Sequence, residues 1–157
     1  MQVRSVGVIG AGAWGTALAI VAARAGHPVR LWARDQRTVE DIAAAGENAA
    51  RLPGIALPAA ITATGAAADL AGCDTVLIAI PAQTMRTVMS EFARHLTPGT
   101  RAVITAKGIE QSTGGFMVDV LHEVAPRLEP MVLSGPSFAA DVARGLLMVR
   151  GAVPGTK

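Results

Sequence analysis

The sequence predicts one α/β domain built on a doubly wound, mostly parallel sheet. Two observations support this fold class. Short apolar segments typical of buried strands alternate with Ala-rich segments of helical length, a pattern that favours parallel strands joined by right-handed crossovers. The composition agrees, because 51% of the 157 residues are hydrophobic and only 3% are aromatic. A chain of this length can bury the core of a single domain.

The expected strands and helices follow one another in a regular order. The first strand, Val6–Ile9, leads into a helix over Ala13–Ala25, and Gly26 stands where a helix C-cap favours glycine. Asp35 is the expected N-cap of the second helix. The other strands are expected at Pro28–Ala33, Ala60–Thr64, Thr75–Ile80, Ala102–Thr105 and Met131–Leu133, and the other helices at Asp35–Ala45, Ala66–Ala71, Gln83–His95, Phe116–Val124 and up to about Ala143.

The junction of the first strand and the first helix carries the pattern G-x-G-x-x-G, formed by Gly10, Gly12 and Gly15. In this context the first glycine permits a tight turn and the second lets backbone N–H groups approach a pyrophosphate. The third lets the helix pack closely on the sheet. The helix, which starts at Ala13 and Trp14, directs its positive dipole end at the phosphates. The pattern therefore predicts a Rossmann-type dinucleotide-binding domain.

Ligands of such sheets bind at the carboxyl ends of the strands, so residues there are candidates for chemistry. Arg34 follows the second strand and can stack on adenine or pair with a 2′-phosphate, which favours NADP or tolerates both NADP and NAD. Asp35 can bind the ribose instead, although its role as an N-cap also explains it. Lys107 follows a buried strand, so its ammonium is expected at the mouth of the cleft, where it can hold a phosphate or polarise a carbonyl.

Two further candidates have alternative explanations. Trp14 lies between the phosphate-binding glycines and either walls off the cofactor or packs between helix and loop. The segment from Ser134 to Ser137 joins a strand to a helix and predicts a second anion site facing the first. Ser137 can also serve as an N-cap, a role that is compatible with anion binding.

Several other classes of function are not expected. The net charge is +2 and the basic residues are scattered, which argues against a nucleic-acid partner. No apolar run of about 18 residues and no signal-peptide pattern occurs, so we expect a cytoplasmic protein without membrane insertion. The single cysteine, Cys73, rules out an internal disulfide and a Cys-based zinc site. Metal-ligand spacing is absent, and the three histidines receive no catalytic role.

Taken together, these segments resemble the bacterial NAD(P)-dependent glycerol-3-phosphate dehydrogenases. The matching pieces stand in the same order over nearly all of residues 5–145. The segments around Trp14 and Ser134 separate the chain from the related 6-phosphogluconate and hydroxyacid dehydrogenases. The pieces are Gly10–Ala19, Leu31–Arg34, Asn48 with Leu52–Gly54, Ala106–Glu110, Leu133–Ala139 and Val142–Gly145.

The resemblance implies reversible hydride transfer between NAD(P)H and dihydroxyacetone phosphate, which gives the sn-glycerol 3-phosphate of phospholipids. It also implies site residues beyond the glycine loop formed by Gly10, Gly12, Ala13 and Gly15. The residues that contact the cofactor are Trp14, Arg34 and Ala139. Gly135 and Ser137 contact the substrate, and Lys107 contacts both cofactor and substrate.

The resemblance ends at Gly145. The family continues there with a Pro-Thr-Ala-Val-like strand, whereas Leu146–Gly151 follows in this chain. We therefore expect a dinucleotide-binding domain over residues 1–145 and a divergent tail over residues 146–157. The helical second domain of the family, with its catalytic lysine, its Arg-Asn pair for the substrate phosphate and a homodimer contact, is expected to be absent.

No catalytic residue is therefore assigned. The chain is expected to bind NADP or NAD with little or no turnover, as a fragment or as the product of a frameshifted or truncated reading frame. One alternative is a non-catalytic nucleotide-binding module that is completed by a partner. Another is a related dehydrogenase domain of the 6-phosphogluconate or hydroxyacid type, which would take a carboxylate substrate.

Overall fold

The structure, a computed structural model, describes residues 4–135 and 138–145. In this part of the chain six strands form one sheet in the order β3-β2-β1-β4-β5-β6, and every neighbouring pair is parallel. The predicted Rossmann-type doubly wound sheet is thereby confirmed. The strands are β1 (Val6–Ile9), β2 (Val29–Trp32), β3 (Ile61–Thr64), β4 (Thr75–Ile78), β5 (Arg101–Ile104) and β6 (Glu129–Val132).

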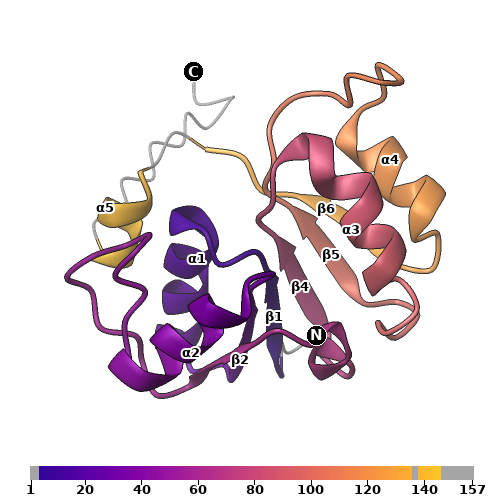
Figure 1. The fold of residues 1–157 in the computed structure, drawn as a ribbon. Coiled ribbons are helices and arrows are strands. Elements are labelled where there is room, and N and C mark those ends of the chain that lie inside the picture. The colour runs from indigo at the N-terminus through magenta and orange to yellow at the C-terminus, as the bar shows by residue number, and fades with distance from the viewer. Residues whose placement is uncertain (1–3, 136–137, 146–157) are drawn as a thin grey trace, which may run out of the picture.

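Helices cover both faces of the sheet (Figure 1). The helices α1 (Ala13–Arg24) and α2 (Gln36–Ala45) lie on one face, and α3 (Met85–Phe92) and α4 (Met117–Val124) lie on the other. The two pairs lie on opposite faces because right-handed crossovers run outward in one direction from β1 and in the other from β4. The strand order thus reverses between β1 and β4, and ligand crevices form at such switch points.

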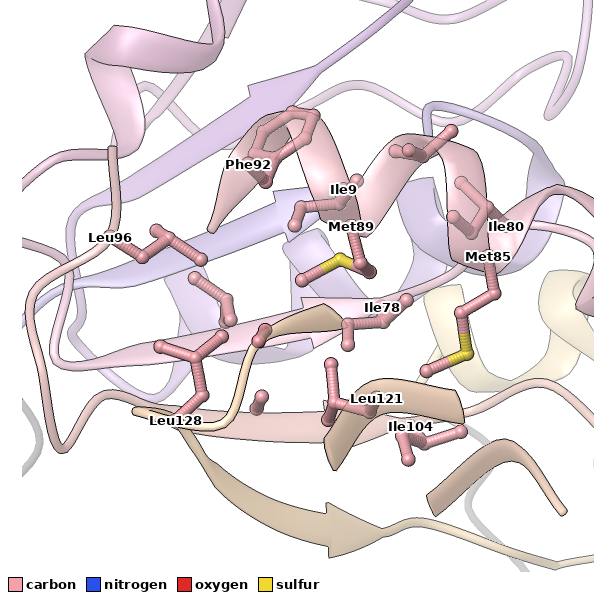
Figure 2. Packing of buried hydrophobic residues seen from close by; sticks show 14 of the residues in the cluster. Ile9, Ile78, Ile80, Met85, Met89, Phe92, Leu96, Ile104, Leu121 and Leu128 are labelled. Atoms are coloured by element: carbon pink, nitrogen blue, oxygen red, sulfur yellow. The ribbon is translucent and has the colours of Figure 1, made fainter. Parts of the chain in front are cut away.

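The largest apolar cluster lies between the sheet and the pair α3 and α4. Figure 2 shows Phe92 and Met89 of α3 over Ile9 and Ile78 of the strands, and all four side chains are fully buried. Phe92 also meets Trp32 edge to face, with ring centroids 5.0 Å apart, an arrangement that aromatic quadrupoles favour. This packing fixes β1, β2 and β4 against α3.

Helix α1 is buried on two sides. Ala19 and Ala23 pack toward the sheet, while Ala17 and Ile20 pack against residues of the 48–57 loop and of a short helix, α5 (Ala139–Ala143). In Figure 1, α5 lies beside α1 on its side away from the sheet. The small residues of α1 are therefore explained by close packing on both sides.

Some boundaries differ from those expected. The helix predicted over Gln83–His95 is a 3-10 turn, η2 (Ala82–Thr84), followed by the shorter α3. The Thr84 hydroxyl donates to the Pro81 carbonyl at 2.9 Å and tightens the first turn. At the other end the N–H of His95 donates to the Phe92 carbonyl at 2.9 Å, three residues back, which ends the regular helix.

Strands β4 and β6 also differ from the prediction. β4 ends at Ile78 rather than at Ile80. β6 begins at Glu129 because that residue is in register with Arg101 of β5, although Glu129 and Pro130 carry no apolar signal. Pro130 is tolerated there because β6 is the edge strand of the described sheet. One side of an edge strand has no neighbouring strand, so a residue without an N–H group loses no hydrogen bond on that side. The segment predicted as a helix near Ala66 is a 3-10 turn, η1 (Ala67–Leu70).

None of the helices in residues 4–135 and 138–145 combines the length and apolarity needed to cross a membrane.

Candidate functional site

The turn between β1 and α1 requires two of the three pattern glycines for steric reasons. Gly10 has φ +114°, and a Cβ there would lie 2.4 Å from the Ala79 carbonyl oxygen. A Cβ on Gly15 would lie 1.8 Å from the Gly10 carbonyl oxygen. Both contacts are with backbone atoms, which cannot turn aside as a flexible side chain can. The predicted tight turn and close packing are thus present.

Gly12 differs, because its backbone suits any residue. It is the N-cap of α1 with φ −71° and ψ 178°, and no side chain caps the helix. A Cβ on Gly12 would meet no atom within 4 Å. The space in front of the first N–H groups of α1 is therefore open, and a helix N-terminus with free N–H groups favours phosphate. These residues fit the diphosphate of a dinucleotide.

The side chain of Asn48 holds the glycine loop in place through two hydrogen bonds. Its side chain is buried, and its amide Nδ2 donates to the Ala11 carbonyl and to Thr16 Oγ1, both at 2.9 Å. The loop is therefore held by a side chain from a segment more than thirty residues further along the chain. Asn48 counted only toward the family resemblance in the sequence, and nothing local in that turn-rich segment signals this contact.

A cavity of about 370 Å³ adjoins the loop on the side of β2. Gly10, Gly12 and Arg34 line it, as expected for the adenosine end of a dinucleotide. Arg51 lines it as well, and the sequence had not singled this residue out. Arg34 and Arg51 are both exposed, so two guanidinium groups border one cavity.

Asp35 serves as the N-cap of α2. Its carboxylate accepts from the N–H groups of Arg37 and Thr38 at 3.3 and 3.2 Å and from the Thr38 hydroxyl at 3.0 Å. The Thr38 hydroxyl and these two backbone N–H groups lower the pKa of Asp35 below its ordinary value, against an opposing effect of desolvation. The N-cap interpretation is confirmed, and Asp35 also lines the first cavity.

A second cavity, of about 330 Å³, lies on the other side of the α1 N-terminus. Five of the predicted site residues meet there although they come from separate segments of the chain. Thr105, Leu133 and Phe138 complete its lining. The five are Ala13, Trp14, Lys107, Gly135 and Ala139.

Trp14 is half-buried and packs against the cluster that contains Ile20 and Val142, which confirms its predicted packing role. It also lines this cavity, and its contact with a cofactor stays a prediction. Lys107 is exposed at the cavity. No carboxylate in the described ranges lies within 4.0 Å of its ammonium, so the cation is available to a ligand. Ser137 lies outside the described residues. Across 4–135 and 138–145, no three His, Cys, Asp or Glu residues gather as a metal site would require.

Comparison with known proteins identifies the family. The family model described as NAD-dependent glycerol-3-phosphate dehydrogenase N-terminus matches residues 5–149. Two curated relatives, each named glycerol-3-phosphate dehydrogenase [NAD(P)+], come from Azorhizobium caulinodans and Parvibaculum lavamentivorans. They are 57% and 52% identical over 141 and 143 residues, which make up 90% and 91% of this chain and 43% of each relative.

Solved structures agree with this result. The glycerol-3-phosphate dehydrogenase of Coxiella burnetii superposes with a TM-score of 0.84 at 32% identity, over 90% of this chain and 43% of that one. The enzyme GPD1 of Saccharomyces cerevisiae gives 0.80 at 28% identity, over 91% and 45%. The chain spans less than half the length of these relatives. Since the family model covers most of its residues, the chain belongs to the NAD-dependent glycerol-3-phosphate dehydrogenase family, whose N-terminal part it matches.

Proposed function

We propose that this chain is the cofactor-binding part of a glycerol-3-phosphate dehydrogenase. In this proposal it binds the cofactor across the switch point between β1 and β4: NAD(P)H for hydride transfer to dihydroxyacetone phosphate, and NAD(P)+ for hydride transfer from sn-glycerol 3-phosphate. The observation that carries the proposal is the second cavity, where Trp14, Lys107 and Gly135 meet beside the N-terminus of α1. The names of the relatives supply glycerol 3-phosphate and NAD(P)+, and the family resemblance supplies dihydroxyacetone phosphate as the oxidised partner.

Each part of the site has a role in this proposal. The bound nicotinamide supplies or accepts the hydride. The N–H groups at the start of α1 hold the diphosphate. The ammonium of Lys107 balances negative charge on a phosphate or on a carbonyl oxygen, and Trp14 and Leu133 give this cavity apolar walls.

In this proposal the reaction needs more groups than the described lining of the second cavity provides. Among the described residues that line it, Lys107 is the only titratable side chain. Reduction of a carbonyl needs a positioned proton donor as well as a hydride. One lysine cannot at the same time donate the proton and bind the phosphate of the substrate, so a second group is needed for one of these two roles.

The first cavity favours NADP over NAD in this proposal. Arg34 and Arg51 border it together, and guanidinium groups are suited to phosphate because they donate in a planar fork. Asp35, the acidic residue that would favour the ribose of NAD, is held in its N-cap hydrogen bonds. Asp35 also lines this cavity, so a 2′-phosphate would meet two cations and one carboxylate that is already hydrogen-bonded to the start of α2.

Titration of the purified chain with NADPH and NADH, followed by nicotinamide fluorescence, tests both parts of the proposal. We expect saturable binding of both and tighter binding of NADPH. Arg34→Ala and Arg51→Ala should each weaken NADPH by about tenfold, as loss of a charge-assisted hydrogen bond does, and leave NADH nearly unchanged. Arg37→Ala is the matched control, because Arg37 is 85% exposed and does not line the cavity.

A folded chain that binds neither nucleotide would refute the cofactor proposal. Tighter binding of NADH than of NADPH would refute the preference and leave the cofactor site itself standing.

A further inference from the structure

Lys107 occupies a short span of backbone between two anchored points. Before it, the N–H and the hydroxyl of Thr105 both donate to the Ile78 carbonyl, at 3.1 and 2.9 Å. Thr105 is buried, so this end of the span is fixed to β4. Gly108 follows Lys107 with φ +106°, a conformation that turns the backbone sharply and suits glycine.

The other anchor comes from the turn that precedes α3. Gln83 donates through Nε2 to the Ile109 carbonyl at 2.8 Å and accepts through Oε1 from the N–H of Gln111 at 2.9 Å. One exposed side chain thus satisfies two backbone groups of the 105–116 loop. In Figure 1 this loop passes from β5 toward α4 close to the start of α3.

A partly buried ion pair strengthens the second anchor. Arg86 donates through Nε and Nη2 to the two carboxylate oxygens of Glu110, both at 2.8 Å. The Thr113 hydroxyl adds a bond of 2.6 Å to Glu110 Oε2. The Glu110 side chain is only 6% exposed, whereas the second partner of Arg86, Glu123, at 2.7 Å, is 61% exposed.

The pair stays ionised over the physiological range. Hydrogen bonds from Arg86, and next from Thr113, lower the pKa of Glu110 from its ordinary 4.5 to about 2. Bonds to Glu110, and next to Glu123, raise the pKa of Arg86 above its ordinary value. A bidentate, charge-assisted pair defines geometry as well as charge.

We propose that Gln83, Arg86 and Glu110 are positioning residues for Lys107. Lys107 itself has no ionic partner among the described residues, so the position of its ammonium depends on the backbone that carries it. The hydrogen bonds of Gln83 and the Arg86–Glu110 pair hold that backbone and keep Lys107 at the cavity that Trp14 also lines. Preorganisation of this kind improves affinity by lowering the cost of ordering on binding.

This inference rests on the proposed function, in which Lys107 contacts the bound cofactor. The test is a double-mutant cycle on the full chain with NADPH as the probe. We expect Lys107→Ala to weaken NADPH by about tenfold, as loss of a charged contact does. Gln83→Ala should weaken NADPH by about threefold to tenfold when Lys107 is present. In the Lys107→Ala background it should change affinity by less than about 1.5-fold.

Glu110→Gln provides the second arm of the test, because it replaces a different contact of the same loop with a residue of the same shape. Its effect on NADPH affinity should also disappear in the Lys107→Ala background. Glu123→Gln is the matched control. It removes a partner of Arg86 without touching residues 105–111, so NADPH affinity should stay unchanged.

The outcomes separate the two proposals. If Gln83→Ala and Glu110→Gln weaken NADPH equally with and without Lys107, the residues only support the fold and the inference is overturned. If Lys107→Ala has no effect while the chain still binds NADPH, the inference also fails but the glycine-loop site remains. If the folded chain binds no NADPH at all, the proposed function fails and the inference falls with it.

Discussion

Gly12 and Gly15 belong to one pattern, yet the structure predicts opposite consequences for the same substitution. In Gly12→Ala the new methyl group would meet no protein atom within 4 Å. Alanine restricts the unfolded chain, which stabilises by about 0.4–1 kcal/mol, and it is a poorer N-cap than glycine by about the same amount. The two effects offset each other, so the melting temperature should stay within about 2–4 °C of that of the unmodified chain.

Binding should nevertheless be lost in Gly12→Ala, because the methyl group occupies the open space where the diphosphate would approach the N–H groups of α1. We expect NADPH to bind at least about a hundredfold more weakly, which corresponds to loss of about 2.7 kcal/mol or more of phosphate contacts. Nicotinamide fluorescence measures the affinity, and circular dichroism on heating measures the stability.

In Gly15→Ala the methyl group would lie 1.8 Å from the Gly10 carbonyl oxygen. The backbone must move, and such overpacking costs about 1–3 kcal/mol or more. The melting temperature should fall by roughly 2–12 °C for a chain of this size. The reasoning is refuted if Gly12→Ala binds NADPH as tightly as the unmodified chain, or if Gly15→Ala melts at an unchanged temperature.

Three further predictions concern stability. Asn48→Ala leaves the buried Thr16 hydroxyl and the Ala11 carbonyl without their donor, so urea unfolding should show a loss of about 1–3 kcal/mol; an unchanged midpoint would refute this role of Asn48. Phe92→Ala removes a fully buried ring and should cost about 3–5 kcal/mol, seen in the same assay; a loss below 1 kcal/mol would contradict the packing. The depressed pKa of Glu110 contributes stability that is complete above its unfolded pKa of about 4.5 and is lost as the pH falls toward 2. In Glu110→Gln the melting temperature should therefore fall less steeply as the pH is lowered from 4.5 to 2. An equally steep fall would show that the Arg86–Glu110 pair does not cause it.

Much of the fold could be predicted because its two central strands, β1 and β4, are short apolar or β-branched segments bounded by turn residues. Val6–Ile9 was predicted without error, and the start of β4 at Thr75 was predicted as well. β6 was misplaced because the pairing of Glu129 with Arg101 fixes its start, and neither residue signals a strand by hydropathy. A register that depends on a neighbouring strand is a tertiary property and leaves no local pattern.

Some residues of the candidate site could be predicted from the sequence and others could not. Residues at strand ends, such as Lys107 and Gly135, could be found because parallel strands bring their carboxyl ends to one edge. Arg51 and Asn48 could not, because they lie in an irregular loop whose path is decided by packing against α1. The ion pair between Arg86 and Glu110 could not be predicted for a related reason. Arg86 lies on another element, 24 residues away from Glu110.

The burial of α1 on two sides has a consequence for motion. An element packed between the sheet on one side and α5 with the 48–57 loop on the other cannot open without dissolving both interfaces, so its amide hydrogens should exchange only through global unfolding. The strand β6, whose four residues are all exposed, belongs to the part that opens locally and exchanges early. The end of the crevice that would receive the diphosphate is thus as long-lived as the domain itself, whereas the edge of the sheet at β6 opens without it.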